Sequence, residues 1–471
     1  MMYEVAIGLE IHAQLLTNTK LFCGCNNEFG GEANSKVCPV CAGFPGAIGV
    51  LNKKALYLAA ASGMVTDCSI SNYCAFDRKN YFYPDLPKAY QITQQRFPVC
   101  KDGFIEVDGR IIRIDNIHLE EDAGKLMHSG RVSLIDYNRC GVPLVEIVTE
   151  PDIKSAHEAV RFVEELSLRL KYAGICDCKM EEGSLRVDVN ISLSQPGSNK
   201  LGERAEIKNL ASLKSVKKTI QYEIKRQSKI LSEGGSIVCE TRRFDEDLSV
   251  TVPMRRKEQR DDYKYFPEPD ITPVYLTDEE IQNIKYSLPE RPDRRYKRYI
   301  EEYGLSKEEA GIIVAAPEIS EYYDRVCLSC QCYKKLASLI VVGLGRLLNE
   351  HGGDFHALRF AQQELSSLAL MWQEEQVSAA GAMEILELLF ANGGTCIQHA
   401  QKNNLLISFD EKEAESVIDG VLQANLSAIS DYKAGKSKAF GFLMGKAVAK
   451  LGKNTNPAKV KSILEKKLQT Y

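Results

Sequence analysis

The feature that most constrains this chain is a change of apolar periodicity at residues 288–293. Before this point, short segments alternate apolar and polar residues between Gly and Pro, as in VAIGLEIHAQL (5–15) and GSLRVDVNISLS (183–194). Alternation with a period of two predicts half-buried antiparallel strands. Beyond LPERPD (288–293) the spacing becomes helical, and alternating segments all but disappear. The sequence therefore predicts a sheet-rich first part followed by an all-helical second part.

Two stretches of the sheet-rich part, Ser155–Tyr172 and Leu213–Ser232, have the spacing of amphipathic helices, so we expect an α+β fold there. In the second part, Ser306 with Glu309 forms a capping box, and Pro457 stands where a helix can begin. At about 150 residues per domain, 471 residues suggest three domains. We assign a sheet-containing domain to residues 1–292, a helical domain to 293–405 and a small Lys-rich helical tail to 406–471.

Charge is distributed unevenly along the chain. The net charge is −4, yet Asp431–Tyr471 carries ten Lys and no Arg against Asp431 and Glu465, a local net charge of +8. A basic tail on an acidic body suggests that the tail binds a polyanion while the body binds cations. A solvated helix that happens to use Lys is the alternative, and charge alone does not choose between them.

Composition narrows the class of protein further. No apolar run approaches the roughly 20 residues that a membrane helix needs, and the first residues lack a basic region followed by a long apolar stretch. Fifteen Cys at irregular spacings fit reduced thiols or metal ligands better than a disulfide framework. We therefore expect a soluble, cytoplasmic protein that does not bind a membrane.

The sharpest local pattern is a pair of cysteines, Cys23 and Cys25, followed after twelve residues by a second pair, Cys38 and Cys41. Two thiolate pairs joined by a short loop can complete a tetrahedral zinc site, and four sulfurs leave no position open for a substrate. The intervening loop is rich in Asn, Gly and Ser and has little apolar material to hold it. We therefore predict a structural Zn²⁺ in an insertion at 23–41, with four unrelated thiols as the alternative.

Strand alternation also gathers side chains that bind hard cations. In GLEIHAQ, Glu10 and His12 lie on one face of a predicted strand, and Asp188 belongs to a similar polar row. Glu120 and Glu121 form a further acidic cluster. Mg²⁺ takes carboxylate oxygens together with water and phosphate. We therefore expect a Mg²⁺–nucleotide site, with a solvated polar face as the alternative.

Charged segments such as DRKNYFYPD (77–85) and MRRKE (254–258) accompany these acids. Lys and Arg beside an acidic metal site suit phosphoryl transfer, because its transition state spreads negative charge over phosphate oxygens. The sequence has no P-loop, since Ser430 stands where GKS (435–437) would require the first Gly, and it has no G-x-S-x-G elbow. A kinase step would therefore use another kind of site, and any amide hydrolysis would occur elsewhere.

Eight motifs in one order carry a family likeness over essentially the whole chain. The sequence resembles the B subunits of the bacterial aspartyl/glutamyl-tRNA amidotransferases, through GLEIHAQL (8–15), DRKNYFYPDLPKAYQIT (77–93), HLEEDAGK (118–125), DYNRCGVPLVEIVTEPD (136–152), MEEGSLRVDVNIS (180–192), AEIKNL (205–210), ETRRFDE (240–246) and DYKYFPEPD (262–270).

This resemblance implies a reaction. ATP phosphorylates the side-chain carboxylate of Glu-tRNA(Gln) or Asp-tRNA(Asn), and ammonia then displaces the phosphate to give the amide. It also implies a glutamine-synthetase-like cradle for residues 1–292, an amidase A subunit that makes the ammonia and a small C subunit. The helical region and the Lys-rich tail would bind the misacylated tRNA.

The resemblance also implies roles for individual residues. The Mg²⁺ ligands would be Glu10, His12 and Glu121, and the nucleotide site would contain these three residues with Glu120 and Asp188. The candidate catalytic residues are Lys79, Glu121, Arg186 and Arg255.

Two other functions remain open at this point. One is a stand-alone, ATP-dependent amide ligase of the glutamine-synthetase type, acting on a free amino acid. The other is a non-catalytic, zinc-containing scaffold that binds RNA.

Overall fold

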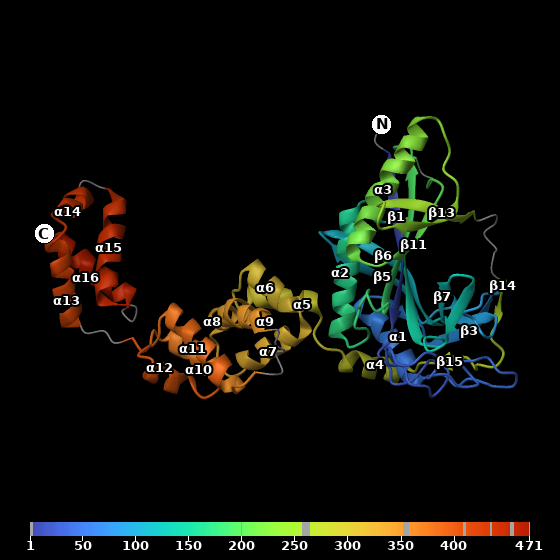
Figure 1. Ribbon diagram of the computed structural model, residues 1–471, viewed down its shortest axis with the longest axis horizontal. Helices are drawn as coiled ribbons and strands as arrows, with labels where there is room; N and C mark the ends of the chain where they lie inside the picture. The colour runs from blue at the N-terminus through green and yellow to red at the C-terminus, as the bar shows by residue number, and fades with distance from the viewer. Residues whose placement is uncertain are drawn as a thin grey trace. The chain divides into compact units, whose positions relative to one another are not determined.

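The computed structural model describes residues 3–198, 200–256, 264–351, 358–407, 411–433, 436–452 and 456–470. The chain divides into two compact units, Met1–Pro292 and Asp293–Tyr471, which are coloured by residue number in Figure 1. The first unit contains the sheets and the second is helical, so the predicted α+β class is confirmed.

A nine-stranded sheet organises the first unit. Its strands, in spatial order, are β13 (Val250–Arg256), β12 (Glu240–Asp245), β11 (Ala205–Leu210), β10 (Leu185–Ser194), β1 (Glu4–Gln14), β9 (Pro143–Thr149), β6 (Arg110–Glu121), β5 (Cys100–Val107) and β2 (Ser69–Ile70). Neighbouring strands are antiparallel except for the parallel pair β11–β12. The first strand of the chain is therefore central, between β10 and β9.

The two faces of this sheet have different environments. Ile7, Leu9 and Ile11 of β1 are buried in one apolar core together with residues of α1 (Lys53–Val65), α2 (Ala156–Tyr172) and α3 (Leu213–Ser232). Strands β3 and β7 lie on the other side of the sheet from α2 (Figure 1). The polar residues of β1 therefore face away from the helical layer.

Smaller sheets complete the unit. Strand β3 (Tyr73–Asn80) pairs with β4 (Tyr90–Phe97), β14 (Lys264–Pro267) and β15 (Val274–Tyr275), and β7 (Lys125–Ser129) pairs with β8 (Val132–Asp136). Helix α4 (Asp278–Ser287) precedes the boundary between the units, and its N-terminus is closed by a capping box of Thr277 and Glu280.

The helices predicted by sequence spacing are present. Helix α2 begins after Ser155, whose hydroxyl accepts from the Glu158 amide, and α3 has the predicted bounds. The sequence analysis did not identify α1, KKALYLAAASGMV. Nine of its thirteen residues are buried, so it lacks the one-sided apolar periodicity that marks a surface helix.

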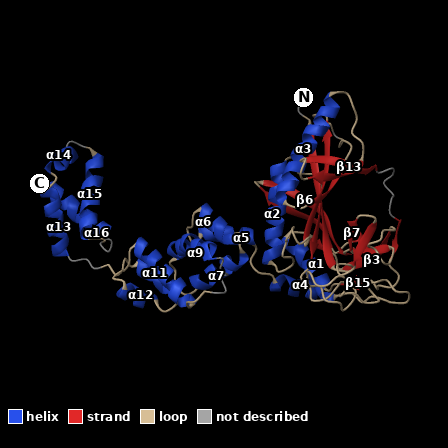
Figure 2. Cartoon of the chain, in the orientation of Figure 1, coloured by secondary structure: helices blue, strands red, loops and turns tan. Residues whose placement is uncertain are grey.

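In the second unit, as far as the structure describes it, the chain is helical. The elements are α5 (Pro292–Glu301), α6 (Lys307–Val314), α7 (Pro317–Cys327), α8 (Tyr333–Ser338), the π-helical turn η1 (Leu339–Leu344), α9 (Gly345–His351), α10 (Gln362–Gln373), α11 (Ala379–Asn392), α12 (Cys396–Lys402), α13 (Glu411–Gln423), α14 (Leu426–Lys433), α15 (Ser437–Leu451) and α16 (Pro457–Thr470). Figure 2 shows them in blue. None of the helices in the described ranges combines the length and apolarity needed to span a membrane.

Two predicted helix starts in this unit are confirmed. Ser306 and Glu309 form the capping box at the start of α6, and Pro457 is the first residue of α16. Helices α13–α16 share an apolar core that includes Ile418, Leu443 and Leu464. This core contains only residues of the segment 414–468, so the end of the chain has a hydrophobic centre of its own.

Candidate active site and cysteine cluster

The polar face of β1 is where metal-binding side chains converge. Glu10 and His12 point to this face, and the strand register places Asp188 of β10 beside Glu10 and Glu146 of β9 beside His12. Since paired residues of adjacent antiparallel strands share a face, one side of the sheet collects acids from several strands. Glu120 of β6 joins them, because β6 is the next strand beyond β9.

These side chains form two groups that could each bind a cation. Within each group, the ligand atoms of all three members lie within 4.8 Å of one another. The first group is His12, Glu120 and Glu146, and the second is Glu10, Asp188 and Glu206. The members of the two groups are not neighbours in the sequence, because they come from five strands, β1, β6, β9, β10 and β11. The two groups therefore place five carboxylates and the His12 imidazole on one face.

Glu146 is the centre of the first group. Its carboxylate lies 3.4 Å from His12 Nε2 and 3.5 Å from His118 Nε2. Burial alone would raise the pKa of Glu146, but the two imidazoles outweigh it and keep this pKa well below the ordinary value. Burial lowers the pKa of His12, and the adjacent Glu146 carboxylate reverses that effect and raises it. Glu146 is therefore a charged oxygen donor at neutral pH.

Glu10 belongs to the second group, and the charge of Glu146 in the first group also shifts its pKa. Burial raises the pKa of its carboxyl, and the charge of Glu146 raises it further. Asn190 Nδ2 donates to Glu10 Oε1 at 2.9 Å. Repulsion between Glu10 and Glu146 indicates that the two groups adjoin, so that cations bound there would relieve a shared excess of negative charge.

Two lysines lie against these acids. Lys208 Nζ contacts Asp188 Oδ2 at 2.5 Å and Glu206 Oε1 at 2.9 Å. Burial lowers the pKa of Lys79, on β3, yet the charges of Glu120 and Glu146 outweigh burial and raise it. Both amino groups are therefore positively charged beside the carboxylate groups.

Contacts of Arg78, the residue before Lys79, hold strand β3 in place. Arg78 forms a bidentate pair with Glu268 (2.7 and 3.0 Å) and a further bond to Asp270 (2.8 Å), while its guanidinium lies 4.3 Å from the centre of the Tyr90 ring. These contacts join β3 to the segment that follows β14. Alternation then directs Lys79 to the opposite side from Arg78, toward the carboxylates.

Glu121, a predicted Mg²⁺ ligand, lies outside both groups. Adjacent residues of a strand point to opposite faces, so Glu120 and Glu121 cannot both face the polar side of β1. Glu121 is buried, ion-paired with Lys88, and accepts a hydrogen bond from the Ile92 amide at 2.9 Å. The structure brings Glu120 rather than Glu121 to the group of His12, and a ligand role for Glu121 stays a prediction.

Of the two predicted arginines, Arg186 lies beside the first group, because it pairs with His12 across β1 and β10. Arg186 Nη2 donates to Asp122 Oδ2 at 2.8 Å, and Gln14 Nε2 donates to the same oxygen at 3.0 Å. Burial raises the pKa of Asp122, but Arg186 and then Arg139 outweigh it and lower it. Arg255 lies in β13 beside Thr241, and its side chain is outside the described residues.

Sequence reasoning missed Glu146 as a site residue, and it included Glu206 and Lys208 only within the family motif AEIKNL (205–210), without a role for either. Glu146 is the single acid in the otherwise apolar strand PLVEIVT, which is a signal that alternation could have used. Glu206 and Lys208 alternate in AEIKNL, but only the pairing of β11 with β10 shows that they face Asp188.

The four predicted zinc ligands converge. The sulfurs of Cys23, Cys25, Cys38 and Cys41 lie within 4.8 Å of one another, with Cys41 Sγ 4.0 Å from both Cys25 Sγ and Cys38 Sγ. Four sulfurs about 2.3 Å from a tetrahedral ion would be about 3.8 Å apart, so this spacing fits zinc. The Cys38 amide donates to Cys41 Sγ at 3.2 Å, which favours a thiolate there.

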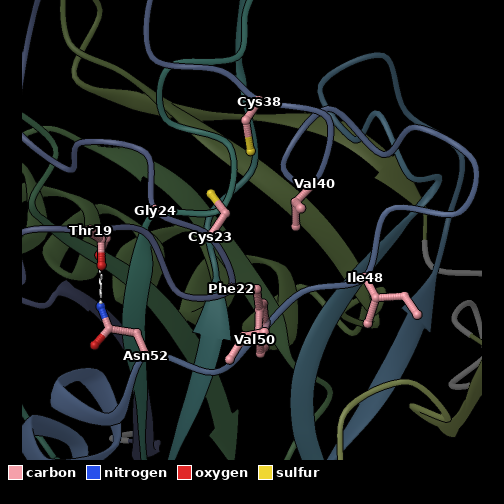
Figure 3. A pocket seen from close by; sticks show the side chains of 9 residues that line it. All are labelled: Thr19, Phe22, Cys23, Gly24, Cys38, Val40, Ile48, Val50 and Asn52. Atoms are coloured by element: carbon pink, nitrogen blue, oxygen red, sulfur yellow. Dashed lines mark hydrogen bonds between the residues drawn. The ribbon is translucent and has the colours of Figure 1, made fainter.

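A cavity of about 420 Å³ lies beside this cluster and not over the carboxylates. Figure 3 shows the sulfurs of Cys23 and Cys38 turned toward each other at its edge, with Thr19 and Asn52 hydrogen-bonded below. The remaining lining side chains are mostly apolar. Since all four sulfurs face inward to one point, the cavity adds no open metal position, and the cluster suits a structural ion.

Comparison with known proteins decides the family. The profile described as the GatB/GatE catalytic domain matches residues 5–282, and the profile described as the GatB domain matches 321–468. The B subunit of the aspartyl/glutamyl-tRNA(Asn/Gln) amidotransferase of Thermoanaerobacter sp. (strain X514) is 45% identical over 99% of this chain and 100% of its own length. The chain belongs to this family of amidotransferase B subunits.

Other relatives with the same name support this membership. The protein of Carboxydothermus hydrogenoformans is 44% identical over 99% of both chains, and that of Caldicellulosiruptor saccharolyticus is 44% identical over the full length of both. The resemblance found in the sequence motifs is thereby confirmed. Residues 5–282 correspond to the catalytic domain of the family, and they contain every residue of the two carboxylate groups.

Proposed function

We propose that this B subunit uses ATP to activate the side-chain carboxylate of Glu-tRNA(Gln) or Asp-tRNA(Asn) and then converts it to the amide with ammonia. The observation that carries the proposal is the grouping of five carboxylates and one imidazole on one face of the central sheet, with Lys79 and Lys208 beside them.

The chemistry requires such a site. A carboxylate is a poor electrophile, so its oxygen must first attack the γ-phosphorus of ATP, with ADP as the leaving group. The nitrogen of ammonia then attacks the acyl carbon, and phosphate leaves with the bonding electrons. Both steps move negative charge among phosphate oxygens, and fixed positive charges stabilise that movement.

The donor set of the two groups fits Mg²⁺. All donors are carboxylate oxygens except His12, and hard cations prefer oxygen. Bound there, Mg²⁺ would neutralise phosphate charge and orient the nucleotide. We propose Glu10, His12, Glu120, Glu146, Asp188 and Glu206 as the residues that hold it, with Glu121 as a further candidate from the sequence.

We propose that Lys79 and Lys208 bind phosphate or substrate carboxylate. Both amino groups are held in the charged form by the acids around them. Arg186 and Arg255 remain weaker catalytic candidates. Arg186 Nη2 is engaged with Asp122, while its buried Nε has no hydrogen-bond partner among the described residues and is free to donate to a ligand.

The remaining parts of the function follow from the family and the charge pattern. We propose an amidase A subunit and a small C subunit as partners, a cytoplasmic location, and binding of the misacylated tRNA by the helical unit. Exposed lysines on or beside α14–α16 would contact tRNA phosphates without selecting sequence. They are Lys433, Lys436, Lys438, Lys446, Lys450, Lys459, Lys461 and Lys466.

The decisive experiment supplies both misacylated tRNAs. The chain with its A and C partners, glutamine and Mg–ATP should yield Gln-tRNA(Gln), Asn-tRNA(Asn) or both, detected by amino-acid analysis of the deacylated tRNA. Absence of both products would contradict the proposal. A stand-alone ligase would instead amidate free glutamate with ATP and ammonium in the absence of tRNA, and a scaffold would tolerate loss of Glu146.

The zinc assignment has a separate test. Since four inward-facing thiolates form a closed site, metal analysis of the purified chain should find about one zinc, and the Cys23→Ser variant should lose it. Cys239→Ser removes a thiol outside the cluster and is the matched control. One zinc that survives Cys23→Ser would place the metal elsewhere.

A further inference from the structure

A lysine is completely buried next to the cysteine cluster. Lys20 has no exposed surface, although lysine is almost never fully buried without partners. Its Nζ lies 3.6 Å from Cys41 Sγ and 3.3 Å from the Tyr137 carbonyl oxygen. An ammonium group has only donors to offer, and here a sulfur and a carbonyl accept from it.

The charge of a four-cysteine site explains why a cation belongs there. Four thiolates around one divalent ion carry a net charge of −2, and burying such a charge is costly unless an opposite charge lies close. Cys41 is the buried member of the four cysteines, and it is the one that Lys20 contacts. The cation is therefore located where the thiolate has least access to water.

We propose that Lys20 is the charge partner of the cysteine cluster, and that its ammonium offsets the thiolate charge and slows release of the metal. This inference rests on the zinc site proposed above. Lys20 does not coordinate the ion. It acts through Cys41 and is a positioning residue.

The residue after Lys20 and the turn at Gly141 connect the cysteine loop to the end of β6. The Leu21 amide donates to the Gly141 carbonyl at 2.9 Å, and the Gly141 amide donates to the Asp122 carbonyl at 2.9 Å. Gly141 has a φ of +82°, and a Cβ there would lie 3.5 Å from Cys41 Cβ and 3.6 Å from Lys20 Cδ. The cysteine loop thus packs directly on the turn that follows β8 and borders the end of β6.

The test compares the zinc-loaded full chain with a Lys20→Met variant, which removes the charge and keeps much of the volume. Zinc release to a chromogenic chelator should be at least about tenfold faster, the size typical of a lost partner of a metal ligand. With Co²⁺ in place of zinc, the sulfur-to-metal charge-transfer band should move to longer wavelength, because the Cys41 lone pair loses the stabilising cation.

Three variants separate charge from packing. Lys36→Met removes a cation of the same loop whose Nζ donates to the Glu28 carbonyl at 2.6 Å, and it should change neither measurement. Lys20→Arg keeps the charge and should keep the cobalt band near its wild-type position. Lys20→Gln keeps hydrogen-bond donors without charge and should behave like Lys20→Met, so it replaces the Met variant if that one does not fold.

Two results would overturn the inference, and they differ from failure of the zinc site itself. A folded Lys20→Met or Lys20→Gln variant with wild-type release and an unshifted band would show that the charge has no role. Equal effects of Lys20→Met and Lys36→Met would assign them to the loop's overall charge. Absence of zinc from the wild-type chain would instead refute the metal site on which the inference rests.

Discussion

Two clusters of buried charge lie on the same nine-stranded sheet, and they differ in how fully positive groups of the chain offset the negative ones. Toward its β13 edge, Glu223 of α3 has no exposed surface and accepts hydrogen bonds from Arg226 (2.8 and 2.9 Å) and Gln227 (2.9 Å). Arg242 of β12 adds a second cation at 3.3 Å. On the central strands, five carboxylates meet with Lys79 and Lys208 as the adjacent lysines.

We propose that this difference separates a structural cluster from a functional one. In the Glu223 cluster, cations and donors of the chain satisfy the acid, so the network joins α3 to β12 and β13 without a ligand. In the carboxylate groups, five acids meet Lys79, Lys208 and Arg186 together with the imidazoles of His12 and His118, and Glu10 is still repelled by Glu146. We propose that a bound cation relieves this repulsion, because perturbed carboxylates gathered in one place are candidates for a functional site.

The largest expected effect comes from Glu146→Gln, which removes one charge and keeps the shape. Because Glu146 is the central oxygen donor of its group, we expect amide formation in the assembled complex to fall at least about 100-fold. The assay is the conversion of Glu-tRNA(Gln) or Asp-tRNA(Asn) with Mg–ATP and glutamine.

The control for this change is Glu106→Gln, the same substitution at an exposed position of β5 in the same sheet. It should leave the rate unchanged. Full activity of Glu146→Gln would contradict the comparison, because the clustered acids would then play no part in catalysis.

The next effect is on stability. Glu223→Gln removes the buried anion that Arg226 and Arg242 contact, so we expect the free energy of unfolding to fall by about 3 kcal/mol, measured by urea unfolding followed by circular dichroism. Glu233→Gln, at the exposed end of the same helix, should cost almost nothing. An unchanged stability of Glu223→Gln would show that the network is not structural.

The stability effect should also depend on pH. Burial alone would raise the pKa of Glu223, but Arg226 outweighs it and the pKa lies below the ordinary 4.5. The charged carboxylate therefore contributes stability fully above pH 4.5, and this contribution is lost as the pH falls through the lower folded pKa. The difference between wild type and Glu223→Gln should shrink on acidification below pH 4.5, and a difference that grows there would reverse the sign of this argument.

The smallest expected effect comes from removing the Lys-rich helices. The cut belongs after Ile407, because Leu406 pairs with Val377 and the Ile407 amide donates to the Gln376 carbonyl at 2.8 Å. We expect the affinity for misacylated tRNA to fall about tenfold, with a shallower salt dependence, because phosphate contacts are lost. Binding of Mg–nucleotide, measured by calorimetry, should stay unchanged, and unchanged tRNA affinity would remove the tail from the proposed function.

Local patterns predicted much of the site because strands alternate strictly. Glu10, His12, Glu120 and Asp188 were identified from alternation and family motifs, and the structure gathers all four on one face. The same rule places Glu120 and Glu121 on opposite faces, but the sequence does not state which of two adjacent acids faces the polar side of β1. Glu146 was missed because a single acid in an apolar strand indicates a site only when the residues on the adjacent strands are known.

Residues close together along the chain were enough to predict the two-part organisation, the helix starts at Ser306 and Pro457, and the four-cysteine cluster. Periodicity, capping and ligand spacing all act over such short separations. The folded chain was needed to show that Glu146 and Glu206 complete the acidic groups and that Lys20 lies against Cys41. These contacts depend on strand order and loop packing between segments that are distant in sequence, and no local pattern encodes which strand becomes whose neighbour.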